Sequence, residues 1–406
     1  MRISLPTLLV VGSLTLVAAE PAPMPRATPD SVGLSAEHLQ LATALLRQYV
    51  SDHKIAGAVA AVARKGKIAY LEPVGWQDLQ TRAPMSERTL FRIYSMTKSV
   101  TAVAVMMLHE EGRFLLTDPV AKYLPEFANV AVLVDPQGTA TRKPSRSITI
   151  ADLLLHTSGL SHRTSDLYQR EQVRSRSIAL PQFIANIVRA PLMEDPGTRY
   201  RYSEGTTVLG RLVEVWSGQP FDVFLRDRVL APLGMADTTF WVAPDAAPRF
   251  ATVYSPAPSG GVRPFQVEEV PFTQKPSLVE GAVGLVSTVP NYLRFCQMLL
   301  NQGELSGVRL LKAKTVEMMT VNSLSPGILK QRGGAMGWGL ANVNVQMNPA
   351  SPSVGEYGWD GTAGTIFWVD PSRELITILM TQSVPANPDG IRQKFKALID
   401  QSLVTP

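Results

Sequence analysis

The sequence predicts an α/β fold of the α+β type, in which both ends of the chain build one sheet and a mostly helical region is inserted between them. Short apolar runs joined by turns, typical of strands, occur near both ends, at about 58–74 and 365–381. Between about 96 and 280, apolar residues recur mainly at helical spacing. The chain has 406 residues, 45% hydrophobic and 18% charged, so it is able to bury a large core.

The first 19 residues have the pattern of a secretory signal peptide. Arg2 gives a weak positive start, Leu5–Val17 is apolar, and Val17-Ala18-Ala19 fits a cleavage site of small residues. The alternative is an uncleaved membrane anchor, but the apolar run is too short to cross a bilayer comfortably. We therefore predict a secreted protein, in a periplasm or released, with no stable membrane span after the signal is removed.

A leader, a helix and a hairpin follow the signal. Residues 20–32 are rich in proline and polar residues, which predicts a flexible leader before a single domain at 33–400. Ser35 is a suitable N-cap for a helix. The apolar residues expected on one side of that helix are Leu41, Leu45, Leu46 and Tyr49. Ala58–Ala63 and Ile68–Val74, separated by a Lys-Gly turn, predict a β-hairpin.

The next element is a strongly apolar helix at Val100–Leu108, with Ser95 just before it and Gly112 as its C-terminal stop. In the middle region, Thr149 and Asp152 have the spacing of an N-cap pair in front of another apolar run. The sequence thus places Ser95 near the start of a buried helix.

Loops and a second strand-rich part complete the pattern. Residues 136–147 and 256–264 are rich in proline, glycine and polar residues and predict exposed loops. Thr365–Val369 and Leu375–Thr381 predict a second hairpin. The last helix is expected at Ile391–Ile399, with its apolar residues on one face.

Several kinds of partner and chemistry find no support in the sequence. The formal charge is +5 and the Lys and Arg residues are scattered, so we predict no nucleic-acid partner. The five histidines form no H-E-x-x-H motif and no phosphate-binding glycine loop is present, so no metal or cofactor is predicted. No G-x-S-x-G motif is present, which excludes the nucleophile elbow of α/β-hydrolases. Cys296 is the only cysteine, which excludes an intrachain disulfide, and its amphipathic helical setting predicts a buried structural thiol.

The segment Ser95-Met96-Thr97-Lys98 points to a chemical reaction. At the start of a helix, residues three apart share a face, so the Ser95 hydroxyl and the Lys98 amine are expected within hydrogen-bond reach. Burial disfavours the charged form of a lysine, which enables it to take a proton from serine. The free N–H groups of the helix start favour the negative oxygen of a tetrahedral intermediate. These features predict that Ser95 is an acylated nucleophile activated by Lys98.

By itself an S-x-x-K motif is weak evidence, because it arises easily by chance. The structural alternative for Ser95 is an N-cap serine followed by a solvated lysine. A second copy, Ser51-Asp-His-Lys54, falls at the end of a predicted helix and is not expected to be catalytic. The surrounding sequence must therefore decide between the two interpretations.

Phe91–Lys98 resembles the nucleophile segment of class C β-lactamases, DD-peptidases and family VIII carboxylesterases. Other segments resemble this family in the same order along the chain; they are Asp118–Pro125, Ile148–Leu160, Pro232–Met235 and Gly284–Thr288. The resemblance implies a serine β-lactamase-like catalytic domain, with an antiparallel sheet flanked by helices. Its α/β part would span about 33–95 and 281–400, and its helical part about 96–280. The active site is implied to lie in the cleft between them.

The second motif of that family is Tyr-x-Asn, which here matches Tyr202 and Glu204. The resemblance implies that Tyr202 relays protons between Ser95, Lys98 and the leaving group. Glu204 departs from the family pattern, because an ionised carboxylate does not donate the hydrogen bonds that asparagine offers to a substrate carbonyl. Glu204 is expected in the substrate pocket, and its presence counts against amide or lactam recognition.

The third motif of the family, Lys-Thr-Gly or His-Thr-Gly, matches Trp359, Asp360 and Gly361, which we expect to line the substrate pocket. In β-lactamases and DD-peptidases the cation at the first position helps to bind a substrate carboxylate, whereas Trp359 is neutral and Asp360 would repel it. The Trp-x-Gly form resembles the family VIII carboxylesterases. The resemblance also implies an oxyanion hole formed by the backbone N–H groups of Ser95 and Thr362.

Three functions remain open on the sequence alone. The first is a serine hydrolase or acyltransferase for small uncharged acyl esters of short to medium chain length. The second is a β-lactamase or D-Ala-D-Ala carboxypeptidase of the same fold. The third is a catalytically silent binding protein, since Glu204 and Asp360 both add negative charge near the expected site.

Overall fold

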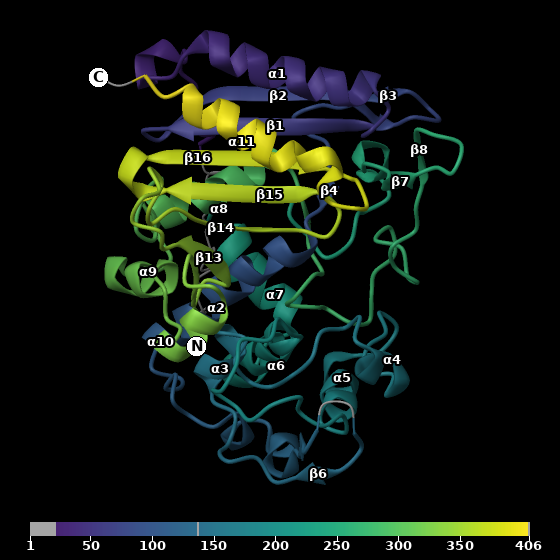
Figure 1. Ribbon diagram of the computed structural model, residues 1–406, viewed down its shortest axis with the longest axis vertical. Coiled ribbons are helices and arrows are strands. Elements are labelled where there is room, and N and C mark those ends of the chain that lie inside the picture. Colours follow the sequence, from purple (N-terminus) through teal and green to yellow (C-terminus); the bar gives the residue numbers. More distant parts are fainter. Residues whose placement is uncertain (1–21, 136–137, 405–406) are drawn as a thin grey trace, which may run out of the picture.

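The computed structural model describes residues 22–135 and 138–404 and has one large sheet at its centre (Figure 1). Eight strands pair antiparallel in the order β12-β13-β14-β15-β16-β1-β2-β3. The strands are β1 (Gly57–Arg64), β2 (Lys67–Asp78), β3 (Ala83–Pro84), β12 (Met336–Gly339), β13 (Val343–Gln346), β14 (Tyr357–Asp360), β15 (Thr365–Asp370) and β16 (Leu375–Thr381). Both ends of the chain contribute strands to this sheet, as predicted, and the α/β fold class is confirmed.

The two chain ends meet at the pairing of β1 with β16, where Ala58 lies opposite Thr381 and Arg64 opposite Leu375. Successive side chains of a strand point to opposite faces. Val59 and Ala61 therefore enter the core on one face of the sheet, while their neighbours enter the core on the other. Because both faces are covered, β1 is an almost continuous run of small apolar residues.

Two terminal helices, α1 (Ala36–Ser51) and α11 (Ile391–Gln401), cover one face of the sheet (Figure 1). Ser35 caps α1 as predicted, because its side chain accepts a hydrogen bond from the His38 N–H. The predicted apolar side of α1 is partly wrong, since Leu41 is 48% exposed. The residues of α1 that are buried are Leu39, Ala42, Thr43, Leu46 and Tyr49.

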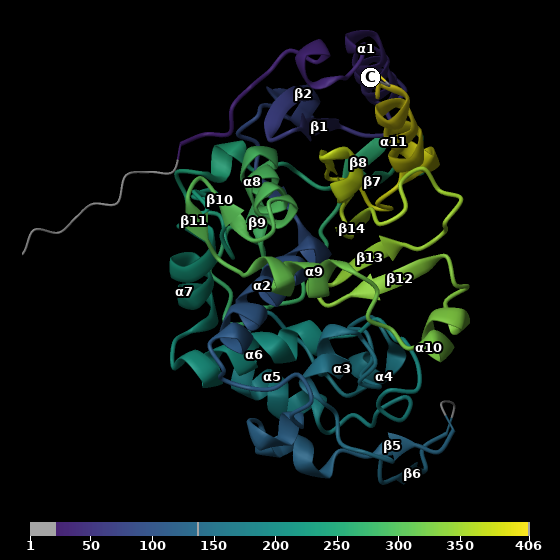
Figure 2. The ribbon, with the colours of Figure 1, turned by 90° about the vertical axis from the view of Figure 1, so that its left-hand side faces the viewer.

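The opposite face of the sheet rests on α8 (Val289–Leu300) and α2 (Thr97–Glu110), and Figure 2 shows these helices between the sheet and the helical region. Cys296 lies in α8 and is fully buried, and burial raises the pKa of its thiol well above the ordinary value. Gly112 follows α2 with a φ of 72°, a left-handed conformation that suits glycine at a helix end.

The helical region contains α3 (Ile150–Leu154), α4 (Asp166–Arg170), α5 (Leu180–Ile187), α6 (Gly205–Ser217) and α7 (Phe221–Leu225), with a π-helical turn at Arg226–Leu230. Thr149 and Asp152 form a capping box at the start of α3, as the sequence predicted. Two further helices, α9 (Ala313–Thr320) and α10 (Pro326–Gln331), precede the edge strand β12. Short 3-10 helices occur at Asp30–Val32, Tyr94–Met96, Val120–Lys122, Pro125–Asn129, Ala247–Arg249, Pro371–Arg373 and Pro388–Gly390.

Among the described residues, four small strand pairs lie outside the main sheet. They are β4 (Phe91–Arg92) with β9 (Val286–Ser287), β5 (Val132–Leu133) with β6 (Thr141–Arg142), β7 (Tyr254–Pro256) with β8 (Val262–Pro264), and β10 (Glu304–Leu305) with β11 (Val308–Arg309). The predicted loops thus include the short strands β6 and β8, of two and three residues, which are too short for an apolar alternation to reveal them.

The described part of the predicted leader is attached to the sheet. Ile68 N–H donates to the Pro25 carbonyl, and Ala27 N–H donates to the Ile68 carbonyl. These backbone hydrogen bonds, together with the buried Val32, hold the segment, whereas its proline-rich composition predicted a flexible leader. The predicted signal peptide lies outside the described residues. Within 22–135 and 138–404, none of the helices is long and apolar enough to cross a membrane.

Candidate active site

Ser95 lies in a 3-10 turn, Tyr94–Met96, that leads directly into α2. Its side chain is nearly buried, and the residue before it, Tyr94, has a φ of 40°. A positive φ is rare for a bulky residue and stores strain that surrounding contacts must hold. The Tyr94 ring is held by the T-shaped contact with Phe272, with ring centroids 5.9 Å apart. This packed turn positions Ser95 at the start of the buried helix.

Lys98 is buried beside Ser95, one turn along the same helix. Its Nζ donates to Ser95 Oγ at 3.3 Å and to the Ala282 carbonyl oxygen at 3.0 Å. Burying an amine without partners is costly, so these two hydrogen bonds both stabilise the side chain and direct it toward Ser95. The structure therefore brings together the hydroxyl and the amine that the sequence motif predicted.

Tyr202 lies across from this pair, just before α6. Lys98 Nζ is 4.6 Å from the centroid of the Tyr202 ring, a distance at which an amine interacts with an aromatic face. The Tyr202 hydroxyl oxygen accepts a hydrogen bond from Trp359 Nε1 at 3.1 Å. Lys98 thus contacts both Ser95 and the Tyr202 ring, and the Tyr202 hydroxyl is bound to Trp359 of β14.

An aromatic cluster, which we define as His156, Tyr200, Tyr202, Trp338 and Trp359, supports the Tyr202 ring. Ring centroids within it are 4.6 Å apart for Trp338 and Trp359 and 4.7 Å apart for His156 and Tyr202. Trp338 Nε1 donates to the Leu154 carbonyl at 3.1 Å, which ties the cluster to the end of α3. The cluster therefore fixes the phenol from several directions.

Two histidines of the site were not singled out from the sequence. His156 is fully buried, and burial together with the nearby charge of Lys98 lowers its pKa well below the ordinary value. His162 stacks on Tyr202 with ring centroids 5.6 Å apart. Burial also lowers the pKa of His162, although the Glu204 carboxylate opposes the shift. The lowered pKa values favour the neutral form of both histidines, and both rings contact the Tyr202 ring.

Glu204 is buried directly before α6, and its Oε2 accepts a hydrogen bond from Thr207 Oγ1 at 3.0 Å. Burial raises the pKa of this carboxyl, but the positive charges of Lys98 and Arg163 outweigh burial and hold the pKa below its ordinary value. The group is therefore an ionised carboxylate close to Lys98.

Trp359 and Asp360, which the third motif placed together in the pocket, are neighbours on β14 and point to opposite faces of the sheet. Trp359 points to Tyr202, whereas the next residue, Asp360, forms an ion pair with Arg392 of α11. Alternate residues of a strand face opposite sides of a sheet, so Asp360 lies on the side covered by α11. The structure does not bring Asp360 to Ser95, and Arg392 balances the negative charge that was expected to act in the pocket.

Gly361 allows the end of β14 to approach the segment before Ser95. A Cβ atom at Gly361 would collide with the Ile93 carbonyl oxygen and with Thr365 Oγ1. Thr362 follows in an exposed turn. The close packing at Gly361 is what holds the Thr362 backbone in the neighbourhood of Ser95, where an oxyanion hole was expected.

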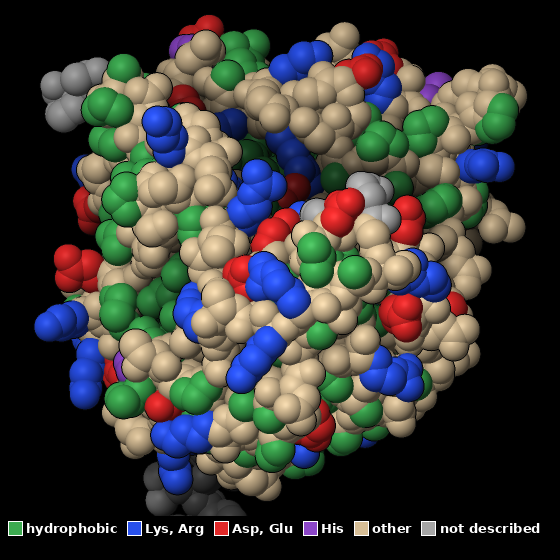
Figure 3. Space-filling model, turned by 60° about the horizontal axis from the view of Figure 1, so that its bottom comes forward, with side chains coloured by type: hydrophobic (Ala, Val, Ile, Leu, Met, Phe, Trp, Pro, Cys, Tyr) green, Lys and Arg blue, Asp and Glu red, His purple; other side chains and the backbone are tan. Residues whose placement is uncertain are grey.

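A network of buried ion pairs, which we call the Arg–Glu network, lies beyond Thr362 and was not predicted. Arg174 pairs with Glu280 at 2.6 Å and with Glu268 at 2.8 Å, and Arg163 pairs with Glu268 at 3.2 Å. The only sequence signal was the charged character of the segment 163–176, which does not reveal where the segment folds. Figure 3 shows one face of the molecule with a hollow and with basic and acidic side chains near its rim.

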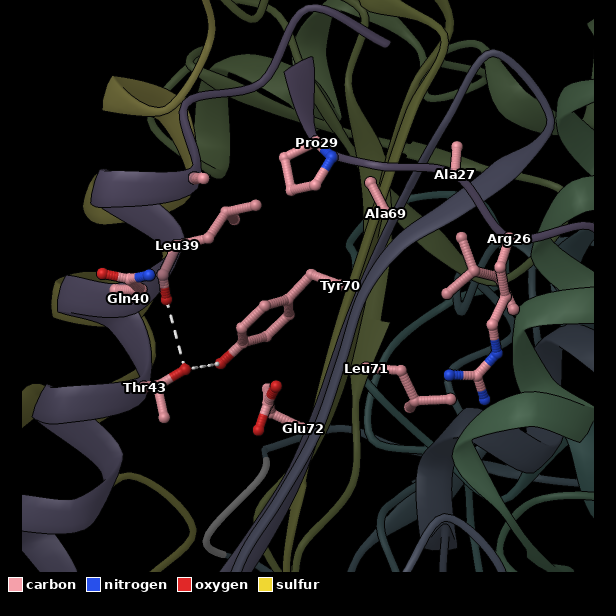
Figure 4. Close-up of a pocket in the computed structure, with 12 residues that line it drawn as sticks. Arg26, Ala27, Pro29, Leu39, Gln40, Thr43, Ala69, Tyr70, Leu71 and Glu72 are labelled. Atoms are coloured by element: carbon pink, nitrogen blue, oxygen red, sulfur yellow. Dashed lines mark hydrogen bonds between the residues drawn. The ribbon is translucent and has the colours of Figure 1, made fainter. Parts of the chain in front are cut away.

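A separate cavity of about 300 Å³ lies between α1 and β2. Figure 4 shows Tyr70 pointing from β2 toward α1, where its hydroxyl meets Thr43 at 3.0 Å. Tyr70 belongs to the core under the terminal helices, so this cavity is on the face of the sheet away from Ser95. In the described part of the chain, no group of three or more His, Cys, Asp or Glu side chains is arranged to hold a metal ion.

Comparison with known proteins gives consistent matches over most of the chain. A family model described as Beta-lactamase matches residues 42–400. Protein Rv1367c from Mycobacterium tuberculosis (strain ATCC 25618 / H37Rv) is 35% identical over 363 residues, 84% of this chain and 89% of the relative. Esterase EstB from Burkholderia gladioli is 29% identical over 398 residues, 90% of this chain and 97% of the relative. The solved structure of EstCE1, a hydrolase with promiscuous acyltransferase activity, has a similar fold, with a TM-score of 0.78, 23% identity and coverage of 91% and 99% of the two chains.

Proposed function

The chain belongs to the Beta-lactamase family, and on that premise we propose that it is an esterase or acyltransferase that acts on uncharged acyl esters through an acyl-Ser95 intermediate. The observation that carries the proposal is the buried pair of Lys98 Nζ and Ser95 Oγ, 3.3 Å apart at the start of α2. A serine beside a buried amine has the arrangement of an activated nucleophile.

Two observations favour esters over substrates that carry a carboxylate. The position where β-lactamases and DD-peptidases have a cation is occupied by Trp359, whose indole N–H is already engaged with Tyr202. A neutral side chain there offers no charge to a substrate carboxylate. The similarity to Esterase EstB over 97% of that protein supports the same choice.

Acylation requires a proton acceptor, an oxyanion site and a proton donor. Ser95 Oγ attacks the ester carbonyl carbon, and its proton passes to Lys98 and Tyr202, which act together as the general base. The backbone N–H groups of Ser95 and Thr362 stabilise the carbonyl oxygen as it becomes negative. The bond from the carbonyl carbon to the alcohol oxygen then breaks, and the alcohol leaves with the proton held by the pair.

Deacylation repeats these steps with water, or with a second alcohol in acyl transfer. The pair of Lys98 and Tyr202 takes a proton from the attacking oxygen and returns it to Ser95 Oγ as the acyl–Ser95 bond breaks. The acid, or the new ester, leaves and the enzyme regains its starting protonation. Trp359 keeps the phenol of Tyr202 directed to the reaction centre in both halves.

The decisive experiment is labelling with a fluorophosphonate probe, followed by mass spectrometry of the modified peptide. We expect one adduct on Ser95 that is lost in Ser95→Ala and formed at least 100-fold more slowly in Lys98→Met. The second S-x-x-K copy provides a matched control: Lys54→Met, which removes a surface amine paired with Asp389 and Asp52, should label at the normal rate. A protein with no adduct on Ser95 at any pH would be a silent binding protein instead.

A substrate panel separates the ester reaction from the related lactam and peptide reactions. We expect turnover of p-nitrophenyl acetate and butyrate to exceed that of a chromogenic cephalosporin and of a D-Ala-D-Ala peptide. Labelled Ser95 together with fast cephalosporin or peptide turnover and no ester turnover would assign the β-lactamase or carboxypeptidase activity.

A further inference from the structure

A cavity of about 670 Å³ adjoins Thr362 and is not part of the predicted pocket. Its walls are the segment from Arg163 to Ile178, Asn186 and residues 267–269. The guanidinium of Arg163 lies 5.7 Å from the centroid of the Tyr94 ring, so the cavity begins beside the residue that precedes Ser95. Its volume is that of a site for a small organic ligand.

The position of the cavity indicates which half of an ester would enter it. Thr362 lines the cavity, whereas Tyr202 and Trp359 do not. In the reaction proposed above, on which this inference rests, the departing alcohol takes its proton near Tyr202 and the carbonyl oxygen lies near Thr362. The substituent that reaches the cavity is therefore the acyl group rather than the alcohol.

The charged side chains of the cavity already neutralise one another. Glu268 accepts from both Arg163 and Arg174, at 3.2 and 2.8 Å, and the side chains of all three are no more than 12% exposed. Glu269 is also engaged, by the Arg176 N–H and by Ser175 Oγ. A charged acyl group would have to break one of these buried pairs and leave a partner uncompensated, which is strongly unfavourable.

The uncharged lining is mostly polar. In the part of the chain that the structure describes, the side-chain amides of Gln169 and Gln172 are exposed and make no hydrogen bond. Ile178 and Val267 are the aliphatic side chains among the lining residues. An alkyl chain in this cavity would cover the two glutamine amides without offering them a hydrogen bond. A site that can hydrogen-bond a polar substrate discriminates against a substrate that lacks the hydrogen-bonding group.

We propose that this cavity binds the acyl group of the substrate and selects uncharged acyl groups that carry amide or hydroxyl functions over alkyl chains of the same size. Gln169 and Gln172 supply the hydrogen bonds to those functions. The Arg–Glu network forms a rigid, neutral floor and excludes acyl groups with a net charge.

Matched substrates test this selection. We compare p-nitrophenyl 4-acetamidobutanoate with p-nitrophenyl octanoate, whose acyl groups have the same number of heavy atoms and whose polar difference is remote from the scissile bond. We expect kcat/KM for the acetamido ester to be at least tenfold higher after correction for the rates of the two esters in buffer. An anionic relative, mono-p-nitrophenyl glutarate, should react more slowly than both.

Variants connect the preference to the cavity. The double variant Gln169→Leu/Gln172→Leu should lower the acetamido-to-octanoate ratio about tenfold, and a ratio measured on one preparation does not depend on how much of it is folded. Gln48→Leu, an exposed glutamine of α1, should leave the ratio unchanged. An octanoate preference in the unaltered protein, or a ratio unaffected by the double variant, would overturn the inference while leaving ester hydrolysis intact. Absence of turnover for all esters, p-nitrophenyl acetate included, would overturn the proposed function as well.

Discussion

The hydrogen bond from Trp359 Nε1 to the Tyr202 hydroxyl, 3.1 Å long, gives a quantitative test of how the phenol is positioned. Trp359→Phe removes the donor and retains an aromatic ring against Trp338. A neutral hydrogen bond contributes about 1 kcal/mol, so its loss from the reacting geometry should lower kcat about fivefold. Because Trp359 acts through Tyr202, we expect KM for p-nitrophenyl acetate to change less than kcat.

The control for this prediction is Trp338→Phe, which removes an indole donor from the same aromatic cluster. Trp338 Nε1 bonds to the Leu154 carbonyl and not to Tyr202, so this variant should lose stability with little change in kcat. Steady-state kinetics and urea unfolding of both variants make the comparison. If kcat is unchanged in Trp359→Phe, or falls equally in both variants, the indole does not position the phenol and acts only in packing.

Three further predictions concern the frame around the site. Gly361→Ala places a Cβ against the Ile93 carbonyl oxygen and should lower kcat/KM about 100-fold by displacing β14. The control Gly327→Ala, whose Cβ would lie in open space, should change kcat/KM by less than about twofold. Burial lowers the pKa of His156 in the folded protein, whereas the same side chain in the unfolded chain takes up a proton near pH 6.5. Lowering the pH from 7.5 to 5.5 should therefore reduce the free energy of unfolding by about 1.4 kcal/mol, and the His156→Gln variant should lack this reduction. Equal pH dependence of the two proteins in urea unfolding would contradict this. Thr149→Ala removes the α3 N-cap and should cost about 1 kcal/mol in the same assay, so an unshifted midpoint would exclude a stabilising role for the capping box.

The elements that follow strong local rules were predictable from the sequence. The hairpin of β1 and β2, the apolar helix α2 and the capping box of α3 each follow from residue spacing over a few positions. The exposed Leu41 shows the limit of such patterns, because several apolar residues of α1 compete for the buried side and only the tertiary contacts decide. The attachment of the leader to Ile68 depends on backbone hydrogen bonds, which leave no mark on composition.

The candidate site shows the same division between local and distant contacts. Ser95 and Lys98 share a helical turn, so their meeting followed from spacing, and Tyr202 entered only through the family resemblance. Asp360 was expected in the pocket because it aligns with the second position of the family's third motif. On a strand, neighbours face opposite ways, and the partner that settles its position, Arg392, is 32 residues away. The Arg–Glu network joins segments about 100 residues apart, which no local pattern reveals.

The buried carboxylate of Glu204 is compatible with the role proposed for Lys98, although Lys98 lies close enough to lower the pKa of Glu204. Within the described residues, the hydrogen bonds of Lys98 Nζ go to Ser95 and the Ala282 carbonyl, and Glu204 is not among its ion-pair partners. The first turn of α6 holds Glu204 through Thr207, so its charge acts on Lys98 across a gap. The Lys98 amine therefore remains directed at Ser95. A carboxylate where the family usually has asparagine is thus compatible with the proposed reaction at Ser95, although an ionised carboxylate accepts hydrogen bonds and does not donate them.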